Sequence, residues 1–112
     1  MSCITITSDG IWAEQELPES DQLLDFLQGC VGGWVEAHDI AHIGGVTIWM
    51  NEEGAIHGLP ENPIGSSIWT QEHGFGRILG DIVLTGSADE QGDTTGLNPQ
   101  QLTTIKERYL HE

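Results

Sequence analysis

The sequence predicts an α+β domain in which a mostly antiparallel sheet of about five strands packs with two or three helices. The strand-like and helix-like segments follow the order β-β-α-β-β-α-β-α, without the regular β-α-β alternation that builds a parallel sheet. No internal repeat is present, and apolar residues, 38% of the chain, are spread along its whole length. A chain of 112 residues suits one core, so we treat residues 1–112 as a single domain that folds alone or as a small homo-oligomer.

The first third of the chain predicts a hairpin followed by a helix. Residues 3–8 are alternating and rich in β-branched side chains, and a turn leads to a second strand-like run at 11–17. Ser20 is the expected N-cap of the helix, which Gly32 and Gly33 should end, because glycine takes a left-handed turn without steric cost. The apolar side chains of this helix recur at helical spacing: Leu23, Leu24, Leu27 and Val31, widened by Phe26 and Cys30.

A second hairpin is predicted from residues 34–40 and 46–51, which are strand-like and are joined through Gly44 and Gly45. Successive side chains of a strand face opposite sides of the sheet. One side of the second strand should therefore carry Val46, Ile48 and Met50, and the other side Thr47, Trp49 and Asn51.

The rest of the chain predicts, in order, a short helix, a central strand, a polar loop and an amphipathic helix: residues 64–74, 77–86, 87–96 and 98–112. Asn62 and Asn98 are the expected N-caps of the two helices, because each is followed by a proline that suits the first helical position. Leu102, Ile105 and Tyr109 should share one face of the last helix.

The chain carries 18 acidic residues against only three basic ones, a formal net charge of -15. Direct nucleic-acid binding is not expected, since such a chain repels phosphates and lacks the cationic contacts that release counterions. The same field would steer the protein toward basic surfaces of other proteins. The alternative is that the acids only keep the protein soluble or reflect an acidic source proteome.

Cysteine usage and hydropathy predict a protein of a reducing cytoplasm. Cys3 and Cys30 form neither a C-x-x-C pair nor a zinc-like spacing, so we expect two free thiols. The N-terminus lacks the basic and apolar regions of a signal peptide. No stretch approaches the roughly 20 apolar residues that span a bilayer, so no membrane association is expected.

Several patterns have a chemical interpretation, and each has a structural alternative. His38 and His42 are four residues apart but lie at a strand end and turn, so no metal site is predicted, and His57 is an isolated turn histidine. Gly74 and Gly76 could hold an anion together with Arg77, or could simply form a turn. The acidic side chains near residue 52 could act as catalytic carboxylates, but no recognisable catalytic motif accompanies Glu52 or Glu61.

The four tryptophans have two interpretations: Trp12, Trp34, Trp49 and Trp69. They could line a pocket for a planar ligand, or most of them could fill the core. In so small a domain we expect at least one of them to be partly exposed.

Three motifs in order, "LQGCVGGWVE", "NEEGAIHGLPEN" and "ILGDIVLTG", followed by a C-terminal helix, resemble a family of small proteins of unknown function. That family is numbered 3846 among the domains of unknown function and is found largely in phages, prophages and mobile elements. The resemblance covers Leu27 to about Tyr109. The matching positions are Val31, Gly32, Gly33, Trp34 and Glu36, then Asn51 to Gly54, Gly58 to Pro60 and Asn62, and finally Gly80 and Asp81. The resemblance implies an accessory protein in a microbial cytoplasm and supplies no reaction.

We therefore expect a non-enzymatic phage or prophage protein that binds and sequesters a host molecule, such as a small nucleotide-like defence signal. One alternative is an acidic decoy that occupies a basic, nucleic-acid-binding surface of a host protein. The other is a small carboxylate-dependent enzyme. No catalytic residue, metal ligand or cofactor is assigned. The candidate ligand-binding residues are Gly32, Gly33, Trp34, Glu36, Asn51, Glu52, Asn62, Arg77 and Asp81.

Overall fold

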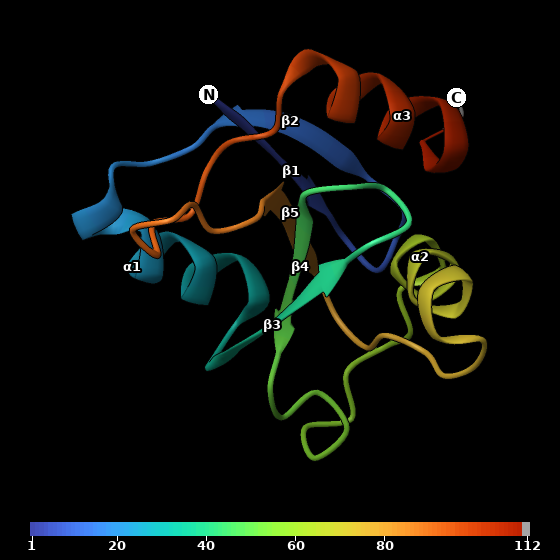
Figure 1. Ribbon diagram of the computed structural model, residues 1–112. Coiled ribbons are helices and arrows are strands. Elements are labelled where there is room, and N and C mark those ends of the chain that lie inside the picture. The colour runs from blue at the N-terminus through green and yellow to red at the C-terminus, as the bar shows by residue number, and fades with distance from the viewer. Residues whose placement is uncertain (111–112) are drawn as a thin grey trace.

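Eight elements follow one another in the predicted order (Figure 1). The computed structural model describes residues 1–110, so the last two residues of the predicted C-terminal helix lie outside it. The strands are β1 (Ser2–Ile6), β2 (Trp12–Glu16), β3 (Val35–Ile40), β4 (Val46–Asn51) and β5 (Ile82–Gly86). The helices are α1 (Ser20–Val31), α2 (Pro63–His73) and α3 (Pro99–Tyr109). Both asparagine N-caps are confirmed, since the side chains of Asn62 and Asn98 accept hydrogen bonds from the backbone of the first helical turn.

The five strands form one antiparallel sheet in the order β2-β1-β5-β4-β3. This confirms the α+β prediction and the central position of β5, which is buried along its whole length. The predicted turn between β3 and β4 is also confirmed. Both Gly44 and Gly45 have positive φ there, at 81° and 72°.

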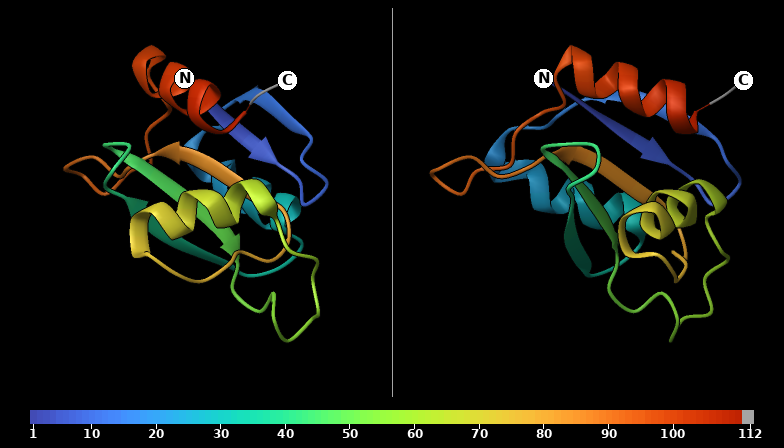
Figure 2. Two further views of the ribbon diagram at one scale, coloured as in Figure 1. Left: turned by 90° about the vertical axis from the view of Figure 1, so that its right-hand side faces the viewer. Right: turned by 45° about the vertical axis from the view of Figure 1, so that its right-hand side comes forward.

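Helices cover both faces of the sheet, with α2 and α3 on one face and α1 on the other (Figure 2). The alternation predicted for β4 is confirmed, because Val46, Ile48 and Met50 join the larger core cluster while Trp49 packs with the smaller cluster under α1. The larger core also contains Ile105 of α3. Among residues 1–110, no helix has the length and apolar character that crossing a membrane requires.

One prediction for α1 is wrong, and one side chain of its apolar set is exposed. Ser20 is already the first helical residue and the N-cap is Glu19, whose side chain makes no capping hydrogen bond. The turn begins one residue early because the Glu19 carbonyl accepts the Gln22 N–H at 2.9 Å. Leu24, one of the apolar side chains at helical spacing, is 55% exposed, whereas Leu27 and Val31 on the same helix are buried.

The strand predicted at residues 77–86 is shorter in the structure, where β5 covers only Ile82–Gly86. Gly80 has φ +89°, and its N–H donates to the Pro60 carbonyl at 2.7 Å instead of to a neighbouring strand. Leu79 pairs in an isolated bridge with Glu61. The segment before β5 is therefore attached to residues 59–62, and this places Asp81 at the edge of a cavity.

Candidate functional site

The predicted ligand-binding residues gather at one end of the sheet, where α1 and β4 end and where β3 and β5 begin (Figure 1). Hydrogen bonds join these segments directly. The Asn51 side-chain amide donates to the Val31 carbonyl at 3.1 Å, and the Glu52 N–H donates to the Trp34 carbonyl at 2.8 Å. Segments that are far apart in the sequence therefore form one surface.

The glycine pair after α1 makes this junction tight. Gly32 takes the left-handed conformation, with φ +80°, and the N–H groups of Gly32 and Gly33 both donate to the Gln28 carbonyl. A Cβ on Gly33 would lie 3.1 Å from the Asn51 side-chain nitrogen. The helix end and the end of β4 thus approach each other at a position that favours glycine.

Asn51 and Asn62 use their polar atoms inside the fold. Asn51 is 7% exposed, and its Oδ1 also accepts the Glu53 N–H at 2.7 Å. Asn62 is fully buried; its Nδ2 donates to the carbonyls of Ile6 and Gly80, both at 3.0 Å, while its Oδ1 caps α2. These contacts position the walls of the site, so both asparagines serve the fold of the site through their amides.

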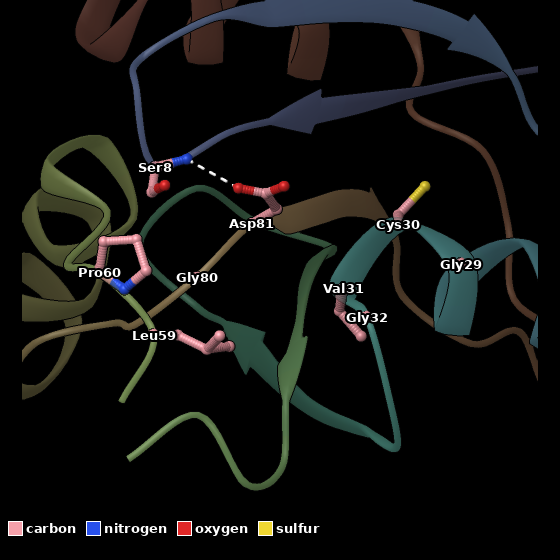
Figure 3. Close-up of a pocket in the computed structure, with 9 residues that line it drawn as sticks. All are labelled: Ser8, Gly29, Cys30, Val31, Gly32, Leu59, Pro60, Gly80 and Asp81. Carbon is pink, nitrogen blue, oxygen red and sulfur yellow. Dashed lines mark hydrogen bonds between the residues drawn. The ribbon is translucent and has the colours of Figure 1, made fainter. Parts of the chain in front are cut away.

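A cavity of about 350 Å³ opens between the end of α1, the turn after β1 and the start of β5 (Figure 3). We call it the Asp81 hollow. Gly32 and Asp81 line it among the predicted residues, and Ser8, Cys30 and the Leu59-Pro60 pair line it as well. The hollow therefore combines residues from all three sequence motifs.

The Asp81 hollow is electrostatically negative. Oδ1 of Asp81 accepts the Ser8 N–H at 2.9 Å, and the side chain is only partly buried. The C-terminal end of α1 adds the partial negative charge of its last carbonyl groups. Burial raises the pKa of the Cys30 thiol, and the charge of Asp81 raises that pKa further. Among residues 1–110, no Lys or Arg lines this hollow.

A second cavity, of about 180 Å³, lies at the same end of the sheet. Glu36, Asn51, Glu52 and Arg77 line it among the predicted residues. The Arg77 side chain is exposed and forms no ion pair within residues 1–110. We call this cavity the Arg77 hollow. Its lining includes the cationic side chain of Arg77 and the carboxylates of Glu36 and Glu52.

The tryptophans lie in separate places. Trp34 is 64% exposed, which confirms that at least one is exposed, but it lines neither hollow. Trp12 lies under Lys106, with 5.9 Å from the ammonium nitrogen to the ring centroid. Trp69 contacts the rings of His38 and His73, and Trp49 packs under α1.

His38 and His42 have different partners. His38 contacts Glu36 at 3.0 Å, whereas Nδ1 of His42 contacts Glu72 at 2.7 Å and Nε2 contacts the Tyr109 hydroxyl at 2.8 Å. The hydrogen bonds from His42 lower the pKa of Glu72. In the part of the chain that the structure describes, no three His, Cys, Asp or Glu side chains gather closely enough to hold a metal ion.

The remaining predicted features are turns. Gly74 ends α2 with φ +83°, and Gly76 has φ +102°. His57 lies 3.7 Å from Glu53 within the turn after β4. Sequence reasoning missed Ser8 and Cys30 as lining residues. Ser8 is 73 positions away from Asp81, to which it is bonded, and no local pattern could show that pairing.

Comparison with known protein families shows the family of this chain. The chain belongs to the family described as "Domain of unknown function (DUF3846)", whose model matches residues 1–110. The match thus includes the first hairpin, which precedes the motifs that carried the resemblance. No curated protein and no solved structure matches the chain.

Proposed function

We propose that this member of a domain family of unknown function is a non-enzymatic binding protein that takes a cationic side chain of a basic partner protein into the Asp81 hollow. The observation that carries the proposal is the position of Asp81. Its carboxylate lines the larger of the two hollows at the negative end of α1, with one oxygen held by the Ser8 N–H.

A guanidinium or ammonium group fits the chemistry of this hollow. An ionised carboxylate forms its strongest hydrogen bonds with such donors. The net charge of -15 would accelerate the encounter with a basic surface, because the field of the whole protein steers oppositely charged partners. The acidic composition and the cavity therefore favour the same partner, a basic surface of the kind that binds nucleic acids.

A nucleotide-like ligand is less well supported by the geometry. Its phosphates would face the Asp81 carboxylate and the negative end of α1 in the larger hollow. Arg77, the cation that could attract a phosphate, lies in the smaller hollow beside Glu36 and Glu52. We therefore favour the acidic decoy over capture of a small nucleotide-like signal.

The arrangement of the acids also supports binding over catalysis. Glu52 and Glu61 are both exposed. Glu52 lines the Arg77 hollow, whereas Glu61 takes part in a backbone bridge with Leu79 and lines neither hollow. A carboxylate pair that works as acid and base must face one bound substrate.

We place this binding activity in the cytoplasm of a microbial host, as the accessory function of a phage or prophage. This part of the proposal rests on the motifs that resemble a family found largely in phages, prophages and mobile elements. The two free thiols are compatible with a reducing compartment.

Calorimetric titration with a short poly-arginine peptide tests the proposal. Asp81→Asn removes the charge but keeps an oxygen that can accept the Ser8 N–H. Glu107→Gln is the matched control, since it removes one equal charge from an exposed position on α3. We expect Asp81→Asn to raise the Kd about fivefold, which corresponds to about 1 kcal/mol, and the control to raise it by less than about twofold.

Equal weakening by the two substitutions would show that the peptide responds only to net charge and would remove the proposed role of the hollow. Absence of peptide binding to the unaltered protein at low salt would remove the decoy function itself. Salt adds a further check. Binding should weaken steeply as the salt concentration rises, because the attraction is screened within about 10 Å at moderate ionic strength.

A further inference from the structure

A separate cavity of about 270 Å³ lies at the opposite end of the sheet, where β3 and β5 end and β4 begins. The loop at residues 87–96, drawn in orange in Figure 1, forms one wall of it. The side chains that matter for its chemistry are Asp39, Thr47, Trp49, Ser87 and Thr94. We call it the Trp49 cavity.

The indole ring of Trp49 is fixed in this cavity. Its N–H donates to the Thr85 hydroxyl at 2.9 Å, and that hydroxyl donates in turn to the Gly86 carbonyl at 2.8 Å. Thr85 is fully buried, so this chain of hydrogen bonds is shielded from water. Because the polar edge of the indole is satisfied inside the fold, the ring contributes its aromatic surface to the cavity.

The exposed carboxylate of Asp39 lines the same cavity. Its Oδ1 accepts the Thr47 hydroxyl at 2.8 Å and the Ser87 hydroxyl at 3.4 Å. Thr47 is 6% exposed, and its hydrogen bond anchors the Asp39 carboxylate to β4. Within residues 1–110, Oδ2 of Asp39 accepts no hydrogen bond, and the residues that line the cavity include no Lys, Arg or His. The charge of Asp39 therefore has no counterion in the wall.

The loop wall is ordered by its own hydrogen bonds. Thr95 donates to the Ser87 carbonyl at 2.7 Å across the base of the loop. At the tip, Oδ1 of Asp89 accepts the N–H groups of Gln91 and Asp93 at 2.9 and 3.0 Å. The cavity is thus bounded by strand residues on one side and by a hydrogen-bonded loop on the other.

We propose that the Trp49 cavity binds a small organic ammonium ion. The charged nitrogen faces the Asp39 carboxylate, and the adjoining methylene groups lie on the indole ring of Trp49. A phosphate or carboxylate ligand is disfavoured there because it would meet an uncompensated aspartate. This site lies at the other end of the sheet from the Asp81 hollow and does not depend on the function proposed for that hollow.

The test uses 1,4-diaminobutane as probe, followed through the NMR signals of the four indole N–H groups. Trp49→Phe identifies the Trp49 signal by its loss. Potassium chloride at matched ionic strength measures the effect of screening alone. We expect the Trp49 signal to shift in a saturable manner with the diamine and not with the salt.

Asp39→Asn and Glu107→Gln each remove one negative charge and separate a specific site from diffuse attraction. We expect Asp39→Asn to weaken diamine binding, followed through the Trp49 signal, about tenfold, while Glu107→Gln changes it by less than about twofold. Equal weakening by Asp39→Asn and Glu107→Gln would overturn the proposal. A Trp49 signal that does not move at saturating diamine would overturn it as well.

Discussion

The side-chain amide of Asn62 donates a hydrogen bond to the carbonyl of Gly80 at 3.0 Å, and this contact joins the start of α2 to the segment that enters β5. A second bond from the same nitrogen, to the Ile6 carbonyl, adds the end of β1. Asp81 follows directly in the chain. One buried asparagine therefore fixes the backbone that positions the carboxylate of the proposed site.

Replacement of Asn62 by alanine should cost far more than loss of a helix cap. The change removes the cap of α2 and, with it, the two buried hydrogen bonds that the amide donates to the carbonyls of Ile6 and Gly80. We expect the free energy of unfolding to fall by about 3 kcal/mol. Asn98→Ala is the matched control, because Asn98 also caps a helix that begins with proline but is exposed; it should cost about 1 kcal/mol. Urea unfolding of both variants checks this, and equal losses would contradict the role of the amide bonds.

Gly80→Ala and Gly10→Ala separate backbone strain from crowding. The two glycines have nearly the same φ, +89° and +85°, but a Cβ on Gly80 would lie 2.8 Å from Cδ1 of Leu59, whereas a Cβ on Gly10 meets nothing within 4 Å. We expect a loss of about 1 kcal/mol for Gly10→Ala and about 2 kcal/mol for Gly80→Ala. Thermal unfolding of the pair measures the difference. If Gly10→Ala costs as much as Gly80→Ala, the packing of Leu59 against Gly80 contributes nothing.

The Cys3 thiol should make stability fall in alkaline solution. Burial, with the nearby Cys30 and Glu16, raises the pKa of Cys3 from 9.0 to about 11. The folded state therefore keeps the proton of this thiol at pH values where the unfolded chain has lost it. This contribution to stability is complete below pH 9 and is lost as the pH rises through about 11.

The measurement is the urea midpoint of the unaltered protein minus that of Cys3→Ser, followed from neutral to alkaline pH. Serine does not titrate in this range, so the difference isolates the thiol from the tyrosine and lysine that also titrate. We expect the difference to shrink as the pH rises from 9.0 to about 11. A difference that stays constant would contradict a raised pKa of Cys3.

The order of the elements was predictable because each carries a local pattern. The glycines after α1 and between β3 and β4, and the asparagine-proline pairs before α2 and α3, each act through their own neighbours in the chain. The length of the strand before β5 was not predictable from its apolar run. It is set by the bond from the Gly80 N–H to the Pro60 carbonyl, 20 positions earlier, which hydropathy does not encode.

The geometry around the predicted ligand-binding residues was not predictable from the sequence. All of these residues lie at or beside one end of the sheet. Some line one of the two hollows, and others make the hydrogen bonds that support the walls. Sequence could not separate Asn51 and Asn62, whose amides are used inside the fold, from Asp81, whose carboxylate lines a cavity. Burial decides that difference, and it depends on contacts between distant segments.

The sign of the charge that the Asp81 hollow accepts is the central claim, and backbone amide NMR tests it directly. Methylguanidinium and inorganic phosphate are titrated separately into the protein at matched ionic strength, and the signals of Gly32, Gly80 and Asp81 are followed. We predict saturable shifts of these signals with methylguanidinium, reduced in Asp81→Asn, and none with phosphate. Saturable shifts with phosphate and none with methylguanidinium would contradict the account and would favour a phosphate-bearing ligand over a cationic side chain.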